Sequence, residues 1–222
     1  MRILHTSDWH VGRSLHGQSL HSAHEAWFDH LEELVRAERI DAVLVAGDVF
    51  DRAIPPVISV DLLSDALARL AAHTRVILTP GNHDSAQRLG FASELYADRL
   101  VVRSRVESVG VPVEIPDRDG GTGALIYALP YLDPEMTRGP LGGEQGPVER
   151  SHEAVLRAAM ARVSADLTSR RAGAGARIPA VVAAHAFVVG GEASESERDL
   201  RVGGVETAPA GIFGEEADYL AL

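Results

Sequence analysis

Short apolar segments alternate with longer amphipathic ones along the first part of the chain. Arg2–Thr6, Asp41–Ala46 and Arg75–Thr79 are rich in β-branched and other apolar residues, which is typical of buried strands in a parallel sheet. Between them, apolar residues recur every three or four positions in Ser22–Glu38 and Val57–Ala72, which predicts two amphipathic helices. This β-α-β-α-β order indicates an α/β fold built on a largely parallel sheet.

The rest of the chain predicts a second, mixed sheet. Its strands are expected at Leu100–Arg103, Val106–Val109, Val111–Ile115, Ala124–Tyr131, Pro179–Ala184 and Asp218–Leu222. Two helices are expected at Ala86–Tyr96 and Val148–Thr168. Three segments rich in glycine, proline or polar residues predict a loop at Asp133–Pro147, a linker at Arg170–Ala176 and turns within Phe187–Gly204.

Metal-binding residue types follow directly after four of these predicted strands. The first strand is followed by Asp8 and His10, the second by Asp48, the third by Asn82 and His83, and Pro179–Ala184 by His185. Ligands of α/β sheets bind at the carboxyl ends of the strands, so we expect these side chains to converge at one edge. A single Gly-Asp pair after a strand is usually only a turn, but the recurrence at four strand ends favours a site.

The residue types define the chemistry of this expected site. Carboxylate, amide oxygen and imidazole suit manganese, magnesium, iron or zinc, and the mixed set favours manganese. Asp8 and His10 are two residues apart, so in an extended segment they would point the same way, and Asp48 could bridge two cations about 4 Å apart. His83 fits a proton donor to a leaving oxygen, while Asp51 or Asp84 could orient a histidine.

Composition narrows the class of protein. The chain has 222 residues, 45% of them hydrophobic, which suits one sizeable domain with its own core. It contains no cysteine, no apolar run of about 18 residues and no signal peptide, so we predict a cytoplasmic protein without a membrane segment. The net charge of -11 argues against broad nonspecific binding of DNA. Arg13, Arg52 and Arg88 follow the site motifs and are candidates for local DNA contacts.

Four motifs together resemble those of the calcineurin-like metallophosphoesterases. They are Asp8-x-His10, Gly47-Asp48-x-x-Asp51, Gly81-Asn82-His83-Asp84 and His185. Within that family, Arg2–Gly12, Val45–Asp51 and His185–Gly191 are similar to the nuclease subunits of bacterial DNA-repair complexes. The resemblance covers nearly the whole chain.

The resemblance implies a fold, a cofactor and an activity. The fold is two facing mixed β-sheets flanked by helices. Asp8, His10 and Asp48 resemble ligands of one manganese ion, Asp48, Asn82 and His185 resemble ligands of a second, and His83 resembles the catalytic histidine. The implied activity is ATP-dependent 3′ to 5′ exonuclease and endonuclease cleavage of DNA, including hairpins, together with an ATPase partner subunit. We also consider a homodimer.

The resemblance further predicts more chain after Leu222. Members of the family carry a Gly-His-x-His block after a strand like Tyr219–Leu222, and it adds one histidine to each metal. We therefore expect residues 1–222 to form a metallophosphoesterase domain truncated at its C-terminal end, without the capping and partner-binding regions and with little activity.

Two alternatives remain open on the residues themselves. One is a related phosphoesterase that acts on small phosphomonoesters or cyclic nucleotides, because such an enzyme needs the same metals. The other is a scaffold whose site has decayed, against which the four intact motifs argue.

Overall fold

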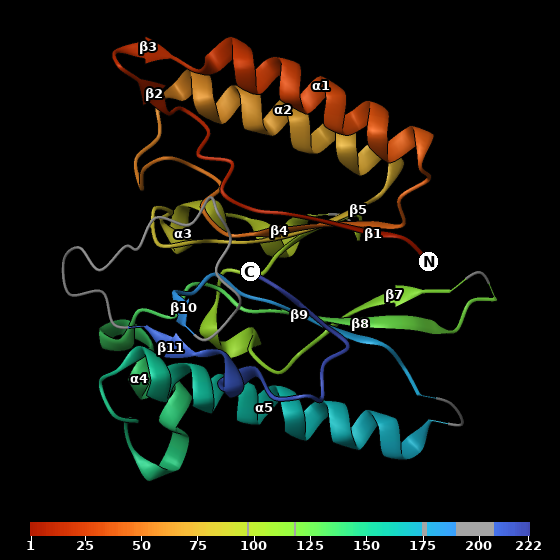
Figure 1. Cartoon of the computed structure of the whole chain (residues 1–222), viewed down its shortest axis with the longest axis vertical. Coiled ribbons are helices and arrows are strands. Elements are labelled where there is room, and N and C mark those ends of the chain that lie inside the picture. Colours follow the sequence, from red (N-terminus) through yellow and green to blue (C-terminus); the bar gives the residue numbers. More distant parts are fainter. Residues whose placement is uncertain (97, 118, 175–176, 190–206) are drawn as a thin grey trace.

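Two four-stranded β-sheets lie face to face, and helices cover the outer face of each (Figure 1). This computed structural model describes residues 1–96, 98–117, 119–174, 177–189 and 207–222. The predicted fold class, an α/β sandwich of two facing sheets flanked by helices, is confirmed. No helix in those ranges combines the length and the apolar character needed to cross a membrane.

The first sheet is parallel throughout. Its order is β1-β4-β5-β6, with β1 at Ile3–Thr6, β4 at Ala42–Ala46, β5 at Arg75–Thr79 and β6 at Leu100–Val102. Helices α1 (His21–Ala37) and α2 (Val57–His73) cover its outer face (Figure 1). Buried residues of these helices, such as Phe28 and Leu63, belong to the same core cluster as Val43 and Val45 of β4.

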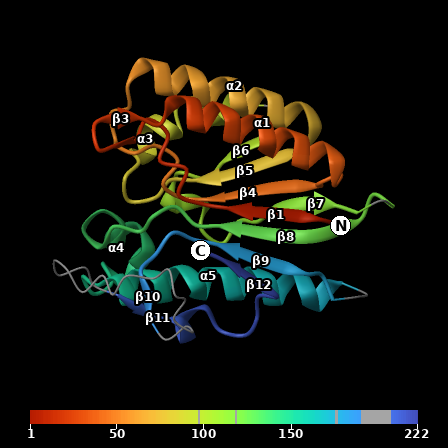
Figure 2. The same ribbon diagram turned by 45° about the horizontal axis from the view of Figure 1, so that its top comes forward.

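The second sheet is mixed. Its order is β12-β9-β8-β7, with β12 at Tyr219–Ala221, β9 at Ala180–Ala183, β8 at Thr122–Ala128 and β7 at Val113–Pro116. Only the β7–β8 pair is antiparallel. Helices α4 (Pro134–Gly142) and α5 (His152–Gly173) lie on the side away from the first sheet (Figure 2).

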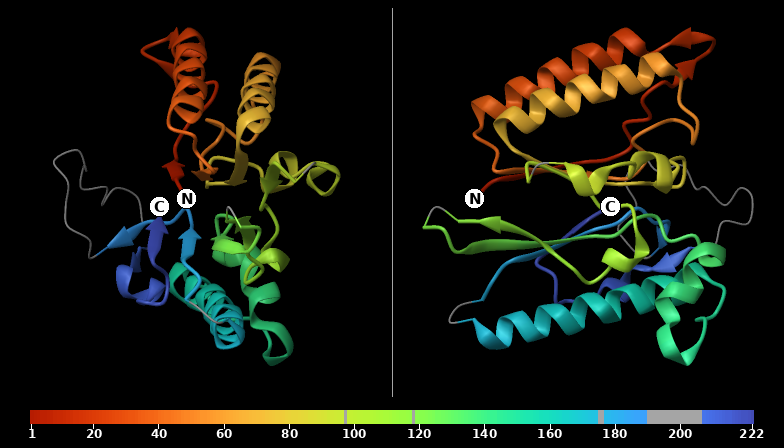
Figure 3. Two further views of the ribbon diagram at one scale, coloured as in Figure 1. Left: turned by 90° about the vertical axis from the view of Figure 1, so that its right-hand side faces the viewer. Right: turned by 180° about the vertical axis from the view of Figure 1, so that it is seen from behind.

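The space between the sheets is filled by apolar side chains from both. Ala42, Leu44 and Ile77 of the first sheet form one cluster with Ile126 and Val181 of the second. Because side chains alternate between the faces of a strand, the other residues of β4 face the helices. Strand β4 is therefore apolar at every position, as expected of a strand covered on both faces. The two sheets are seen along their strands in Figure 3.

Shorter elements complete the described chain. Strands β2 (Ser14–Leu15) and β3 (Gln18–Ser19) form an antiparallel pair, and β10 (Val188–Val189) pairs in parallel with β11 (Ala208–Pro209). Short helices are α3 (Ala86–Leu89) and the 3₁₀ helices η1 (Ser93–Leu95), η2 (Val106–Ser108), η3 (Gly143–Gln145) and η4 (Ala210–Phe213). Of the predicted turns within Phe187–Gly204, residues 190–204 lie outside the described ranges, as do residues 175–176 of the predicted linker.

The loop predicted at Asp133–Pro147 was wrong, because this segment begins with α4. The Asp133 carboxylate accepts the backbone N–H groups of Glu135 and Met136, and Pro134 occupies the first turn. Both features favour the start of a helix. The high glycine and proline content of the segment concealed this signal.

Other boundaries also differ from the predictions. Leu100–Val102 pairs with β5 in the first sheet rather than joining the second, since so short an apolar segment does not specify which edge it meets. Val106–Ser108 is a 3₁₀ helix rather than a strand, and Ala86–Tyr96 holds two short helices rather than one. The predicted linker at Arg170 is helical, because α5 continues to Gly173.

Candidate metal centre

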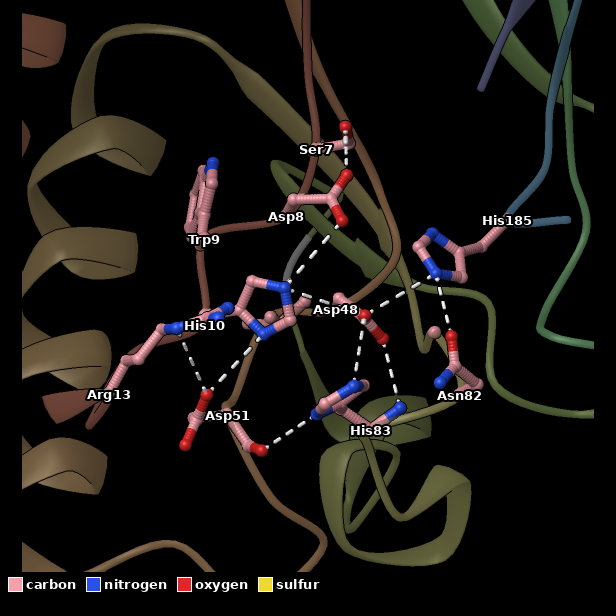
Figure 4. A network of polar contacts seen from close by, with 12 residues as sticks. Ser7, Asp8, Trp9, His10, Arg13, Asp48, Asp51, Asn82, His83 and His185 are labelled. Atoms are coloured by element: carbon pink, nitrogen blue, oxygen red, sulfur yellow. Dashed lines mark hydrogen bonds and ion pairs between the residues drawn. The ribbon is translucent and has the colours of Figure 1, made fainter. Parts of the chain in front are cut away.

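The four predicted strand ends converge at one edge of the facing sheets. The loop after β1 carries Asp8 and His10, the loop after β4 carries Asp48, the loop after β5 carries Asn82 and His83, and His185 follows β9 (Figure 4). The first two loops run side by side, because the N–H of His10 donates to the carbonyl of Asp48 at 2.9 Å and Val11 donates to Val49 at 2.9 Å. Residues from both sheets therefore surround one small space.

Three of these residues have left-handed backbone conformations. The φ angles are 55° at Asp8, 44° at His10 and 49° at Asp48. Such conformations are uncommon for residues other than glycine and are concentrated at functional sites. The prediction of an extended segment through Asp8 and His10 was wrong, because β1 ends at Thr6. Their side chains meet through this turn, with His10 Nε2 3.6 Å from Asp8 Oδ1.

Two glycines let the loops approach closely. A Cβ atom on Gly47 would lie 2.4 Å from His185 Cγ, and one on Gly81 would lie 2.1 Å from Asp48 Oδ1. Gly47 also has a φ of +88°, which glycine adopts without strain. The glycines of both motifs are thus required by the packing of the site, beyond the turns that the sequence indicated.

Asp48 lies at the centre of the cluster. Its Oδ1 accepts the backbone N–H of His83 at 2.9 Å, and its Oδ2 lies 3.4 Å from His185 Nε2 and 3.6 Å from His10 Nε2. The residue is only 3% exposed. Burial opposes ionisation, but the contacts with His185 and the His83 N–H outweigh it and lower the pKa of Asp48. The group is therefore an anion at neutral pH.

The orientation of His185 indicates what belongs between these side chains. Its Nδ1 lies 3.0 Å from the carbonyl oxygen of Ala46, which can only accept, so Nδ1 carries a hydrogen. The opposite nitrogen, Nε2, then faces two oxygens, Asn82 Oδ1 at 3.0 Å and Asp48 Oδ2 at 3.4 Å. A lone pair directed at two oxygens is unfavourable unless a proton or a metal cation lies between them. Burial lowers the pKa of His185, but Asp48 raises it by more, which follows the same demand for positive charge.

Two groups of side chains have the geometry to hold a cation. One comprises His10, Asp48 and His83, and the other comprises Asp8, Asp48 and His185, with the ligand atoms of each group within 4.8 Å of one another. Asp48 belongs to both, as expected of a bridging carboxylate. The interaction with His10, reinforced by Ser7 against the opposing effect of burial, lowers the pKa of Asp8 to about 2, so this ligand is also anionic.

Comparison with known proteins gives the family of this chain. Residues 1–132 match the family model described as Metallophos, calcineurin-like phosphoesterase. The chain belongs to the calcineurin-like phosphoesterase family. Curated relatives include proteins named as the SbcD component of nuclease SbcCD from Rhodobacter capsulatus (37% identical), Escherichia coli K12 (32%) and Bacillus subtilis (31%), each aligned with 100% of this chain. The chain spans 57%, 55% and 56% of their respective lengths.

Two further aspartates shape the site of this phosphoesterase. Asp51 Oδ1 lies 3.7 Å from His10 Nδ1, and the backbone carbonyl of Asp51 accepts from His83 Nδ1 at 2.9 Å. Asp51 thus contacts two histidines from behind. Within the part of the chain that the structure describes, Asp84 contacts no histidine; it instead accepts the backbone N–H groups of Val49, Phe50 and Gly81.

The three candidate arginines differ in their position relative to the phosphoesterase site. Arg13 Nε lies 4.0 Å and Arg52 Nη2 lies 3.9 Å from Asp51, so both guanidinium groups lie beside the cluster. Arg88 instead donates to the carbonyl of Ala53 at 3.1 Å. Of the three, Arg13 and Arg52 are therefore the ones placed next to the site.

Sequence reasoning missed Tyr131. Its ring lies edge-on to His185, with ring centroids 6.4 Å apart, and its N–H donates to the carbonyl of Pro80 at 2.9 Å. It thereby joins the loop that bears Asn82 to the end of β8. A signal was available, since Tyr131 follows a predicted strand in the same way as the metal-type residues do.

Proposed function

We propose that this chain is the nuclease domain of a DNA-cleaving enzyme of the SbcD kind, with two divalent metal ions. The observation that carries the proposal is the orientation of His185, whose Nε2 faces oxygens of Asn82 and Asp48 next to a second group of carboxylate and imidazole ligands. The similarity to the SbcCD relatives over the whole chain supports a phosphodiester of DNA as the substrate.

In this proposal Asp8, His10 and Asp48 hold one metal, and Asp48, Asn82 and His185 hold the other. The mixture of oxygen and nitrogen ligands favours manganese. When bound, the metals would activate a water and hold phosphate oxygens for in-line attack. Asn82 contributes a neutral oxygen, so it adds no negative charge that would repel a phosphate.

His83 is proposed to donate a proton to the leaving oxygen. Its Nδ1 is held by the carbonyl of Asp51, so the nitrogen that can exchange a proton is Nε2, which lies 4.0 Å from Asp48 Oδ2. The side chain is 43% exposed, so a substrate can reach it. Asp51 and Asp84 support the site, Asp51 behind His10 and His83, and Asp84 through the loop backbones.

The partners are proposals too. We propose DNA and an SbcC-type ATPase subunit, with 3′ to 5′ exonuclease and endonuclease activity on ends and hairpins, and Arg13 and Arg52 as contacts to phosphates beside the metals. A cytoplasmic location stays a prediction.

A homodimer also stays a prediction, and it can be tested at one surface. Ile54, Val57, Ile58, Phe91 and Leu95 are apolar and exposed. Large exposed apolar patches commonly mark protein interfaces. If a second copy of the chain binds there, Ile58→Asp should convert a dimer to a monomer in sedimentation experiments.

The test of the function compares metal binding with cleavage. We expect His83→Ala to keep the affinity for Mn²⁺, measured by calorimetry, but to slow cleavage of hairpin DNA by about 10² or more, the size of a general-acid contribution. Asp48→Ala should lose Mn²⁺ binding. His30→Ala, on the exposed face of α1, is the control and should change neither.

Equal loss of Mn²⁺ affinity in His83→Ala and Asp48→Ala would refute this division of roles. Cleavage of a small phosphomonoester or a cyclic nucleotide, but not of DNA at high enzyme concentration, would favour the alternative phosphoesterase.

A further inference from the structure

A cleft of about 680 Å³ adjoins the metal cluster on the side of Asn82. It lies between the segment around α3, the loop after β6 and the start of α4, and Pro80, Asn82 and Tyr131 form its border with the cluster. The α3 and α4 elements lie at the same end of the two sheets (Figure 1). Cavities of this size accommodate small organic groups, and nothing in the proposed chemistry uses it.

The walls of this cleft present flat and apolar surfaces. Phe91 is 76% exposed and Met136 is 69% exposed, although both side chains are large and apolar. Tyr131 is half-buried and lies on the side of the metal cluster. Aromatic and thioether side chains exposed around a concave surface are suited to contact with a planar ring.

The charges around the cleft do not suit a phosphate. Its charged lining residues are Asp84, Arg105, Glu107 and Asp133, so acids outnumber bases. The one cation among these lining residues, Arg105, is 2.8 Å from Glu94 and is thus already paired. A negatively charged group would be repelled from this cleft, whereas a planar group without charge would not.

The cleft is also close enough to the metals to receive part of the same substrate. Asn82 belongs to its border and also contacts His185 at 3.0 Å. The Tyr131 ring lies 6.4 Å from the His185 ring. A phosphate held at the cluster would therefore place the base of the neighbouring nucleotide beside Tyr131.

We propose that this cleft binds one unpaired nucleobase of the substrate strand, next to the phosphate that is cleaved, with Phe91 and Tyr131 as stacking surfaces. This inference rests on the proposed function, since it requires a nucleotide phosphate at the metal cluster. Stacking on aromatic side chains accepts any base, so the cleft would select for a base that has left the duplex and not for a particular sequence.

The test uses two probes with Mn²⁺ present: 2-aminopurine deoxyribonucleoside 5′-phosphate, whose fluorescence falls when its base stacks, and the abasic deoxyribose 5-phosphate. We expect the probe with the base to bind more tightly than the abasic probe, by about 5-fold to 150-fold, the range for one stacked base. Its fluorescence should fall on binding.

Variants then separate the cleft from the metal cluster. Phe91→Ala and Tyr131→Ala should each reduce the advantage of the 2-aminopurine probe and leave binding of the abasic phosphate unchanged. Tyr131→Phe keeps the ring and should behave like the original chain. Leu95→Ala is the matched control, because Leu95 is 85% exposed and nearby but is not among the residues that line the cleft.

The outcomes distinguish the two proposals. If the abasic phosphate binds in a Mn²⁺-dependent way but the base adds no affinity and no quenching, the base subsite is refuted and the proposed function stands. If neither probe binds in the presence of Mn²⁺, both proposals are refuted. If Phe91→Ala and Leu95→Ala have equal effects, Phe91 is not a stacking surface and the proposed pair of stacking surfaces is refuted.

Discussion

Asp84 allows a sharp test of how the loops of the site are held together. Its carboxylate joins two loops: Oδ2 accepts from Val49 at 3.0 Å and from Gly81 at 2.8 Å, and Oδ1 accepts from Phe50 at 2.8 Å. Burial raises the pKa of Asp84 by more than these N–H groups lower it. The negative charge by itself is therefore unfavourable in the fold, and the stabilising contribution comes from the three hydrogen bonds.

Removal of these acceptors has a predictable magnitude. A buried donor without a partner costs about 1–3 kcal/mol, and the lower end applies because the three contacts are only partly buried. Asp84→Ala should therefore lower the free energy of unfolding by about 3 kcal/mol. Asp84→Asn can still accept from Val49 and Gly81 through its one oxygen, so it should cost only about 1 kcal/mol.

Urea denaturation at pH 7 in metal-free buffer measures both free energies, and calorimetry with Mn²⁺ reports the effect on the site. The affinity for Mn²⁺ should follow the same order, because the two loops carry Asp48 and Asn82. A loss for Asp84→Ala that is equal to or smaller than the loss for Asp84→Asn would refute this account of the hydrogen bonds.

Three further predictions follow from other contacts. Gly47→Ala should weaken Mn²⁺ binding in calorimetry because its Cβ would meet His185, whereas Gly17→Ala, with a similar φ of +79° and open space, should carry only the backbone strain of about 1–2 kcal/mol. Asp218→Asn should destabilise the fold at pH 7 in urea. Burial opposes the charge of Asp218, but the Ala180 N–H and Arg177 outweigh it and lower its pKa, so this stability is present above the ordinary aspartate pKa and disappears as the pH falls through the lowered value. Binding of duplex DNA should be weak at physiological salt because the net charge is -11, and at low salt Arg52→Gln should reduce it in a filter assay more than Arg88→Gln, whose side chain is directed at Ala53.

The sequence by itself determined which segments form the sheets and where the chemistry lies. The apolar run of β4 and the amphipathic helices could be predicted because burial selects residues with a regular period. The site could be predicted because parallel strands end at one edge, so residues distant in sequence, such as Asp8 and His185, were expected together. Local pattern and strand topology were sufficient for both.

The tertiary structure alone decided how these side chains meet. The tautomer of His185 depends on the carbonyl of Ala46, and the nearness of Asp8 to His10 depends on left-handed backbone that only the neighbouring loop stabilises. The binding of loop N–H groups by Asp84, the position of Tyr131 and the cleft beside it likewise arise from contacts between segments that are far apart in sequence. A periodic pattern records which face of an element is buried, but it does not record which atom lies opposite, and that is what sets the chemistry of this site.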